Sequence, residues 1–252
     1  MDRPFIYIAA LRRSGSNLLC EALSQLPRSF VFREPGIPRG LFRLKDDDVA
    51  RFAELGVDLR ALRRARPEAA EERLADFAGR VLPALRERVE QLGIKEIKHA
   101  GWRELLAALP DTRIVVTARD PRDVYVSLHH KRADRGIAFK GELTPAGVAE
   151  EVERTFREQR AMLEETDALR IRYEDLCTDP GTWETLRDHV DSPLADLGSV
   201  GDLNRHNRRV HGDTVSALHV GRWRHEPDAG LRAGAEATFE RLSGYAAFWG
   251  YA

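Results

Sequence analysis

The stretch "ALRRSGSNLLCEAL", residues 10–23, contains the order of features that decides the fold. The apolar run FIYIAA, which begins at Phe5, precedes it. Two arginines, the polar turn Ser-Gly-Ser-Asn and an amphipathic helical pattern follow. A strand, a glycine-containing turn and a helix in this order build an anion site, because the turn and the helix start present backbone N–H groups. The stretch lacks the G-x-x-x-x-G-K-[ST] pattern of the common nucleotide triphosphate loop. The sequence therefore predicts an anion-binding loop of a different kind.

The composition is ordinary for a soluble globular enzyme. Of the 252 residues, 42% are hydrophobic and 32% are charged, which is far from the composition of a disordered chain. The formal net charge of −1 argues against a non-specific nucleic-acid binder, which needs a broad basic face. Cys20 and Cys177 lack a C-x-x-C spacing, so we expect a reduced chain. With no signal peptide before Phe5 and only short apolar runs, we expect a cytoplasmic protein without stable membrane insertion.

Short β-rich apolar runs alternate with helical patterns, which is typical of an α/β fold with a parallel sheet. The expected strands are 5–10, 29–33, 94–98, 113–118 and 168–173, and the expected helices are 16–26, 102–109, 121–131, 145–165 and 231–248. Residues 45–91 are rich in Arg, Glu, Ala and Leu and predict two or three helices on one side of the sheet. Because no repeat or low-complexity linker interrupts the chain, we expect a single domain over residues 1–252.

Charged side chains follow the expected strands at the points where they end. The residues concerned are Arg12 and Arg13 after the first strand, Arg33 and Glu34 after the second, Lys98 and His99 after the third, and Arg119 after the fourth. Ligands of open parallel sheets bind at the carboxyl ends of the strands. This convergence favours an anionic ligand.

A second stretch, "RIVVTARDPRDVYVSLHHKR" at 113–132, combines an arginine and a serine at a defined spacing. Arg119 ends a buried strand, and Asp120 followed by Pro121 is a typical helix start. Ser127 lies eight residues after Arg119, within that helix. An arginine at a strand tip and a serine two turns along the next helix can hold one phosphate from two sides. The alternative is a surface salt bridge from Arg119 to Asp120 or Asp123.

Together these stretches resemble the sulfotransferases that use 3′-phosphoadenosine 5′-phosphosulfate (PAPS). In that family a Lys/Arg-Ser-Gly-Ser/Thr-Thr loop holds the 5′-phosphosulfate, and an arginine and a serine spaced by eight bind the 3′-phosphate. The corresponding residues of this chain are Arg13, Ser14, Gly15, Ser16 and Asn17, with Arg12 beside them, and then Arg119 and Ser127. Two further elements match in order: "RYEDLCTDP" at 172–180 and "VGRWRHE" at 220–226.

The resemblance implies a fold and a set of cofactor contacts. The fold is a P-loop NTPase-like three-layer sandwich whose central, mainly parallel sheet has about five strands. Tyr173 is expected beside the adenine, and Gly221, Arg222 and Trp223 are expected to cover the 3′-phosphate. A helical insert at about 40–91 and a covering loop at about 201–228 are expected to shape the acceptor pocket. PAPS is the implied co-substrate, 3′,5′-adenosine bisphosphate the product, and no metal is required.

Transfer of a sulfuryl group to a hydroxyl needs a base for the hydroxyl proton. Related bacterial and carbohydrate enzymes carry an acidic residue after their second strand, which corresponds to Glu34 here. His99 is the alternative, because cytosolic relatives use a histidine after the third strand. Arg13 is the expected electrostatic partner of the breaking bond, and Lys98 can assist it.

Several questions stay open at this point. Leu18 stands where many relatives have an adenine-stacking tryptophan, so Tyr173, Trp223 or an apolar wall is expected to hold the adenine instead. The acceptor can be a hydroxyl of a small molecule, a sugar or a glycolipid, or a peptide tyrosine, and the oligomeric state is not predicted. Two other functions are considered: a P-loop kinase or nucleotide-binding protein, and a non-catalytic relative that binds an adenosine phosphate.

Overall fold

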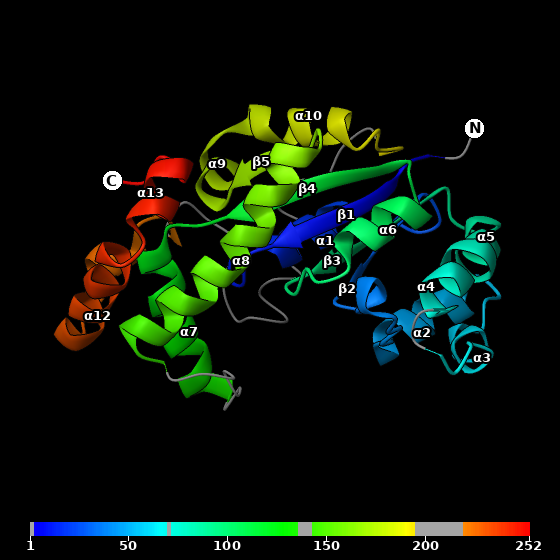
Figure 1. Ribbon diagram of the computed structural model, residues 1–252, viewed down its shortest axis with the longest axis horizontal. Helices are drawn as coiled ribbons and strands as arrows, with labels where there is room; N and C mark the ends of the chain where they lie inside the picture. The colour runs from blue at the N-terminus through cyan, green and yellow to red at the C-terminus, as the bar shows by residue number, and fades with distance from the viewer. Residues whose placement is uncertain (1–2, 70–71, 136–142, 195–218) are drawn as a thin grey trace.

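The computed structural model describes residues 3–69, 72–135, 143–194 and 219–252. Within these ranges, five parallel strands form one sheet with helices on both faces, an α/β arrangement of the P-loop type (Figure 1). The strands are β1 (Phe5–Ala10), β2 (Ser29–Arg33), β3 (Gln91–Glu96), β4 (Thr112–Ala118) and β5 (Leu169–Arg172). Their order in the sheet is β2-β3-β1-β4-β5. The chain therefore builds one side of β1 first and then the other, which makes the carboxyl end of β1 the switch point where such sheets bind ligands.

Strand β1 is uniformly apolar because both faces of the sheet are covered. Its alternate side chains enter two separate cores, as the period of two in a strand requires. Phe5, Tyr7 and Ala9 belong to one cluster of buried residues, whereas Ile6 and Ile8 belong to the other. The predicted α/β fold is confirmed.

Two groups of helices cover the two faces. Leu19 of α1 (Ser16–Ala22), Leu176 of α9 (Tyr173–Thr178) and Leu186 of α10 (Pro180–His189) share the core of Ile6 and Ile8. The other core receives residues from α6 (Trp102–Ala108), α7 (Pro121–Arg135), α8 (Pro145–Glu165), α12 (Ala229–Glu240) and α13 (Ser243–Trp249). On this side Gln159 Nε2 donates to the carbonyls of Ala9 and Thr117, which ties α8 to the two central strands.

The stretch between β2 and β3 is helical, as predicted. It contains the short 3₁₀ turn η1 (Ile37–Arg39), α2 (Asp46–Ala53), α3 (Leu59–Arg64), α4 (Glu72–Asp76), the π-helical turn η2 (Phe77–Val81) and α5 (Leu82–Arg86). The helices α2 to α5 lie at the β2 end of the molecule, and α12 and α13 lie at the opposite end (Figure 1). Phe52 of α2 packs against Phe30 and Phe32 of β2, with ring centroids 5.0 and 5.3 Å apart. Aromatic packing therefore joins this insert to the edge of the sheet.

The predicted position of the third strand is wrong by three residues at its start. The strand covers 91–96 rather than 94–98, because its parallel register pairs Ser29 with Gln91 and Arg33 with Lys95. Lys95 therefore lies near the carboxyl end of the sheet inside the strand, while Lys98 and His99 follow outside it. Pairing with both neighbouring strands decides the register.

The helix boundaries also differ from the prediction in places. The expected closing helix over 231–248 is two helices, α12 and α13, which meet at Arg241 and Leu242. Helix α12 begins earlier because Asp228 caps it by accepting hydrogen bonds from the N–H groups of Gly230 and Leu231. Helices α9 and α10 follow β5 directly and were not predicted, so Tyr173 begins a helix instead of ending a strand.

Substitution of Gly93 tests the packing of the central strands. A Cβ atom at this position would lie 2.7 Å from Ile6 Cβ and 2.8 Å from the Ile6 carbonyl oxygen. We expect Gly93→Ala to lower the free energy of unfolding by about 1–3 kcal/mol or more in urea denaturation. Gly244→Ala in α13 is the control, because a Cβ there meets nothing within 4 Å and should leave stability equal or higher. Equal stability of Gly93→Ala and wild type would contradict this account.

Candidate functional site

The loop after β1 is shaped by a glycine that packs against an aromatic ring. Gly15 has φ 72°, and a Cβ at this position would lie 2.4 Å from Cδ2 of Tyr173. Gly15 is the N-cap residue of α1, and no side chain accepts a hydrogen bond at this helix start. The N–H groups of Ser16 and Asn17 in its first turn therefore have no capping acceptor. The buried Ser14 hydroxyl donates to the Leu11 carbonyl at 2.6 Å and lies 2.6 Å from Thr117 Oγ1. The side chain of Ser14 thus holds the loop on the sheet.

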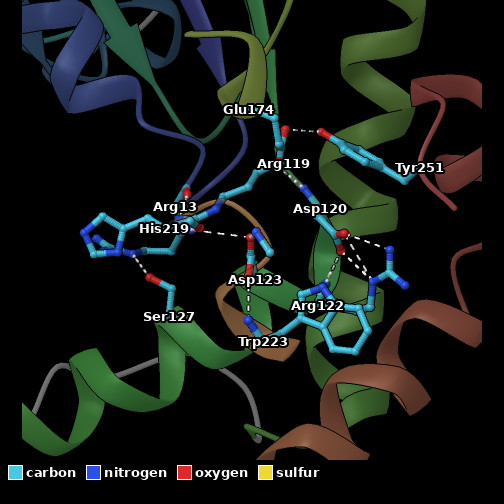
Figure 2. Close-up of polar contacts among 11 residues, drawn as sticks. Arg13, Arg119, Asp120, Arg122, Asp123, Ser127, Glu174, His219, Trp223 and Tyr251 are labelled. Carbon is cyan, nitrogen blue, oxygen red and sulfur yellow. Dashed lines mark hydrogen bonds and ion pairs between the residues drawn. The ribbon is translucent and has the colours of Figure 1, made fainter. Parts of the chain in front are cut away.

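Arg119, directly after β4, joins this loop to two other segments (Figure 2). Its guanidinium donates to the carbonyls of Arg13 at 3.1 Å and His219 at 2.8 Å, and it lies over the Tyr173 ring at 4.2 Å. The residue is only 7% exposed. Its Nε atom has no hydrogen-bond partner among the described residues. An arginine cannot lose its charge, so Arg119 places a permanent positive charge inside the site.

Arg13 and Ser127 are in direct contact. Arg13 Nε donates to Ser127 Oγ at 2.9 Å, which connects the loop after β1 to α7 (Figure 2). Arg13 has φ 69°, a left-handed conformation that residues other than glycine rarely adopt. The two stretches singled out from the sequence therefore meet at one place, the carboxyl ends of β1 and β4.

The segment His219–Glu226 lies on α7. Asp123 accepts hydrogen bonds from the backbone N–H groups of Gly221 at 2.8 Å and Trp223 at 3.0 Å. The Trp223 ring packs against the Arg122 guanidinium at 4.4 Å, and His130 Nε2 is 2.6 Å from Glu226 Oε2. Arg222 is exposed. Residues 201–218 of the predicted covering loop lie outside the described residues.

The acidic partner of Arg119 is Asp123, and the pair is buried. Asp123 is 1% exposed and its Oδ2 atom lies 3.8 Å from the Arg119 guanidinium. Burial raises the pKa of Asp123, against the lowering effect of Arg119. Asp120 pairs instead with Arg122 at 2.8 Å. The alternative interpretation of Arg119 is therefore confirmed in its partner, Asp123, and wrong in its location, because the ion pair is internal and not on the surface.

Glu34 lies at the exit of β2 beside a buried lysine. Its carboxylate accepts a hydrogen bond from Lys95 Nζ at 2.5 Å; the Glu34 side chain is 42% exposed, whereas that of Lys95 is 2% exposed. Glu34 also has a positive φ, 60°. Burial raises the pKa of Glu34, but the charge and hydrogen bond of Lys95, together with the charges of Lys45 and Arg12, outweigh the effect of burial and hold the pKa below its ordinary value. Glu34 is thus an accessible carboxylate that is ionised at neutral pH.

Glu96 supports the turn that follows Glu34. Its carboxylate accepts a hydrogen bond from the Gly36 N–H and lies 3.7 Å from the Arg39 guanidinium. The residue is fully buried, and burial raises the pKa of Glu96 to about 7. Two carboxyl groups near one strand exit therefore have opposite pKa shifts, one lowered and one raised.

The other predicted residues have different surroundings. His99 is 4% exposed, its Nδ1 atom lies 3.1 Å from the Tyr7 hydroxyl, and burial lowers its pKa to about 4, so the ring is neutral. Lys98 is exposed. Arg12 forms an ion pair with Glu151 of α8 at 3.8 Å.

Sequence reasoning missed Lys95, and it named Asp123 only as a possible surface partner of Arg119. A lysine inside a buried strand was a usable signal, because such a charge requires a partner. For the contacts of Asp123 with the Gly221 and Trp223 N–H groups no comparable signal existed, since an acid in the first turn of a helix is common for local reasons.

Within the described ranges, no group of three or more His, Cys, Asp or Glu is arranged to hold a metal ion. None of the helices in the same ranges combines the length and apolar character that crossing a membrane requires.

Comparison with known proteins agrees with the geometry. A model of the "Sulfotransferase family" matches residues 4–196. One similar structure is the sulfotransferase domain from the curacin biosynthetic pathway, with a TM-score of 0.60 and 18% sequence identity; the match covers 96% of this chain and 99% of that domain. Another is the sulfotransferase domain from the Synechococcus PCC 7002 olefin synthase, with a TM-score of 0.54 and 19% identity, and the match covers 96% of each chain. A mouse sulfotransferase complexed with PAP is also similar, with a TM-score of 0.53 and 12% identity; the match covers 98% of this chain and 88% of that one. No curated protein matches the chain in sequence.

The raised pKa of Glu96 predicts a pH dependence of stability. Because the pKa is about 7 in the folded chain and 4.5 ordinarily, the folded state binds more protons between these values, and stability falls as the pH rises through them. Glu96→Gln keeps an acceptor for the Gly36 N–H and removes the charge. We expect this variant to lose less stability than wild type between pH 5 and pH 8, by on the order of 1–3 kcal/mol in urea denaturation.

Glu90→Gln, at an exposed glutamate just before β3, is the matched control and should follow the wild type at both pH values. The same pH dependence in Glu96→Gln and wild type would show that Glu96 does not have the raised pKa.

Proposed function

The chain belongs to the sulfotransferase family, and from this premise and the geometry of the site we propose that it transfers a sulfuryl group from PAPS to an acceptor hydroxyl. One observation carries the proposal. Arg13, Arg119 and Ser127 converge where β1 and β4 end, and the segment that begins at His219 lies on the same place. Two arginines, a hydroxyl and an uncapped helix start suit a ligand with two separate anionic groups.

The proposed donor contacts divide between the two ends of the site. Arg119 and Ser127 bind the 3′-phosphate, under Gly221, Arg222 and Trp223. Support comes from the buried Arg119 Nε and Trp223 Nε1 atoms, which have no hydrogen-bond partners among the described residues. Arg12, Arg13 and the loop Ser14–Asn17 bind the 5′-phosphosulfate. Tyr173 contributes an aromatic surface for the adenine.

Glu34 is the proposed base. As the acceptor oxygen forms its bond to sulfur, the bond from sulfur to the phosphate oxygen breaks and the hydroxyl proton passes to the Glu34 carboxylate. Arg13 stabilises the negative charge that remains on the departing bisphosphate. Among the described residues, Arg13 and Glu34 are two of the three non-glycine residues with positive φ, and such strain is concentrated at functional sites. His99 is the less favoured base because it is buried and contacts Tyr7.

For the acceptor we propose only a chemical class. A hydroxyl of a small molecule, a sugar or a glycolipid can approach Glu34 from the side of the helical insert at about 40–91. We propose that the reaction needs no metal ion, because the arginines supply the positive charge. Loss of activity after treatment with a metal chelator would contradict the proposal that no metal ion is needed.

The 3′-phosphate site is tested by binding of 3′,5′-adenosine bisphosphate in calorimetry. We expect Arg119→Lys to bind it about tenfold or more weakly than wild type, because lysine keeps the charge but lacks the planar fork of donors. Arg113→Ala is the control, since Arg113 lies at the other end of the same strand and pairs with Asp167. Preference of the wild type for ATP–Mg²⁺ over the bisphosphate would contradict the proposal and favour a kinase.

The base is tested by turnover with PAPS, measured as bisphosphate release with a panel of phenol, alcohol and sugar acceptors. With an acceptor that gives product, Glu34→Gln should lower kcat by about 10²-fold or more while donor binding stays unchanged. His99→Gln is the matched comparison and should retain most of the turnover. The reverse pattern would assign the base to His99.

A further inference from the structure

The ion pair of Arg119 and Asp123 poses an electrostatic problem for the proposed donor site. A carboxylate 3.8 Å from the arginine that binds a phosphate repels that phosphate and weakens the field of the arginine. If charge alone mattered, a neutral residue at position 123 would bind the phosphate better. The presence of a buried acid at this point therefore requires another reason.

The hydrogen bonds of Asp123 supply that reason. One carboxylate oxygen accepts from the Trp223 N–H (Figure 2). The other accepts from the Gly221 N–H, so a single side chain holds two backbone groups of the covering segment. The same segment is held at its start by Arg119, which donates to the His219 carbonyl. The carboxylate and the arginine thus act on the same few residues.

We propose that Asp123 is a positioning residue, which fixes the segment from His219 to Trp223 over Arg119 and so creates the selectivity for a nucleotide with a 3′-phosphate. This inference rests on the proposed function and deepens it.

Substitution of Asp123 distinguishes its charge effect from its positioning role, because the two predict opposite changes in the affinity for 3′,5′-adenosine bisphosphate. Asp123→Asn removes the negative charge and replaces one acceptor oxygen with a donor, so one of the two N–H groups loses its partner. The charge effect alone predicts tighter binding of 3′,5′-adenosine bisphosphate. The positioning role predicts that it binds about tenfold or more weakly, as expected for a buried hydrogen bond that is lost.

Comparison with 5′-AMP distinguishes positioning from general damage. This ligand lacks the 3′-phosphate, so its affinity should change by less than about threefold in Asp123→Asn if the residue acts only on that part of the site. Calorimetry with both ligands on each variant gives the ratio of the two affinities. Asp76→Asn is the matched control, because Asp76 also pairs with an arginine, Arg80, but lies in α4. It should leave both affinities unchanged.

A second variant changes Gly221, whose N–H group donates to Asp123. Gly221 has φ 65°, and a Cβ there would lie 3.0 Å from Arg224 Nη1, so Gly221→Ala strains the segment while Asp123 stays intact. It should cause the same selective loss. Because both changes break one interaction, the double variant should lose little more than either single variant. If Asp123→Asn does not fold, Gly221→Ala decides the question.

Each outcome has a defined meaning. A selective loss for the bisphosphate in both single variants supports the inference. Unchanged or tighter binding by Asp123→Asn overturns it, as does an equal loss for both ligands. If the wild type itself does not prefer the bisphosphate to 5′-AMP, the proposed function fails, and the inference falls with it.

Discussion

The buried guanidinium of Arg119 is the interaction on which the site depends. A charged group in the interior must be hydrogen-bonded, and Arg119 meets this need with the carbonyls of Arg13 and His219 and with the face of Tyr173. Its own backbone is fixed by the Tyr245 hydroxyl, which donates to the Arg119 carbonyl and accepts from its N–H. Segments that are far apart in the sequence therefore meet at one side chain, and the fold itself brings together the residues of the proposed anion site.

The parts of this site that follow local rules could be predicted from the sequence. The glycine turn after β1, the helix start at Asp120–Pro121 and the spacing from Arg119 to Ser127 are all features of short stretches, and the structure brings them together. Asp123 and Lys95 depend on contacts across the chain, with Gly221 in one case and Glu34 in the other. The shift of β3 has the same cause, since pairing with two neighbouring strands fixed its register. Local pattern predicted which segments form the site, and tertiary contacts decided which charges support it.

The region around Glu34 shows how the ends of two neighbouring strands, β2 and β3, hold two carboxyl groups in different states. Lys95 keeps Glu34 ionised and accessible, whereas burial favours the protonated form of Glu96. Environments that separate two pKa values in this way assign different tasks to similar groups. Here the accessible carboxylate, Glu34, is the one that we propose as the base, and the buried one holds the turn through the Gly36 N–H.

The central claim is that one nucleotide places its two anionic groups at the two ends of this site. A crystal structure of the protein with 3′,5′-adenosine bisphosphate tests it most directly. We expect the 3′-phosphate between Arg119, Ser127 and the segment Gly221–Trp223, and the 5′-phosphate on the loop Ser14–Asn17. A nucleotide bound in the opposite orientation, or bound away from Arg119, would contradict the account.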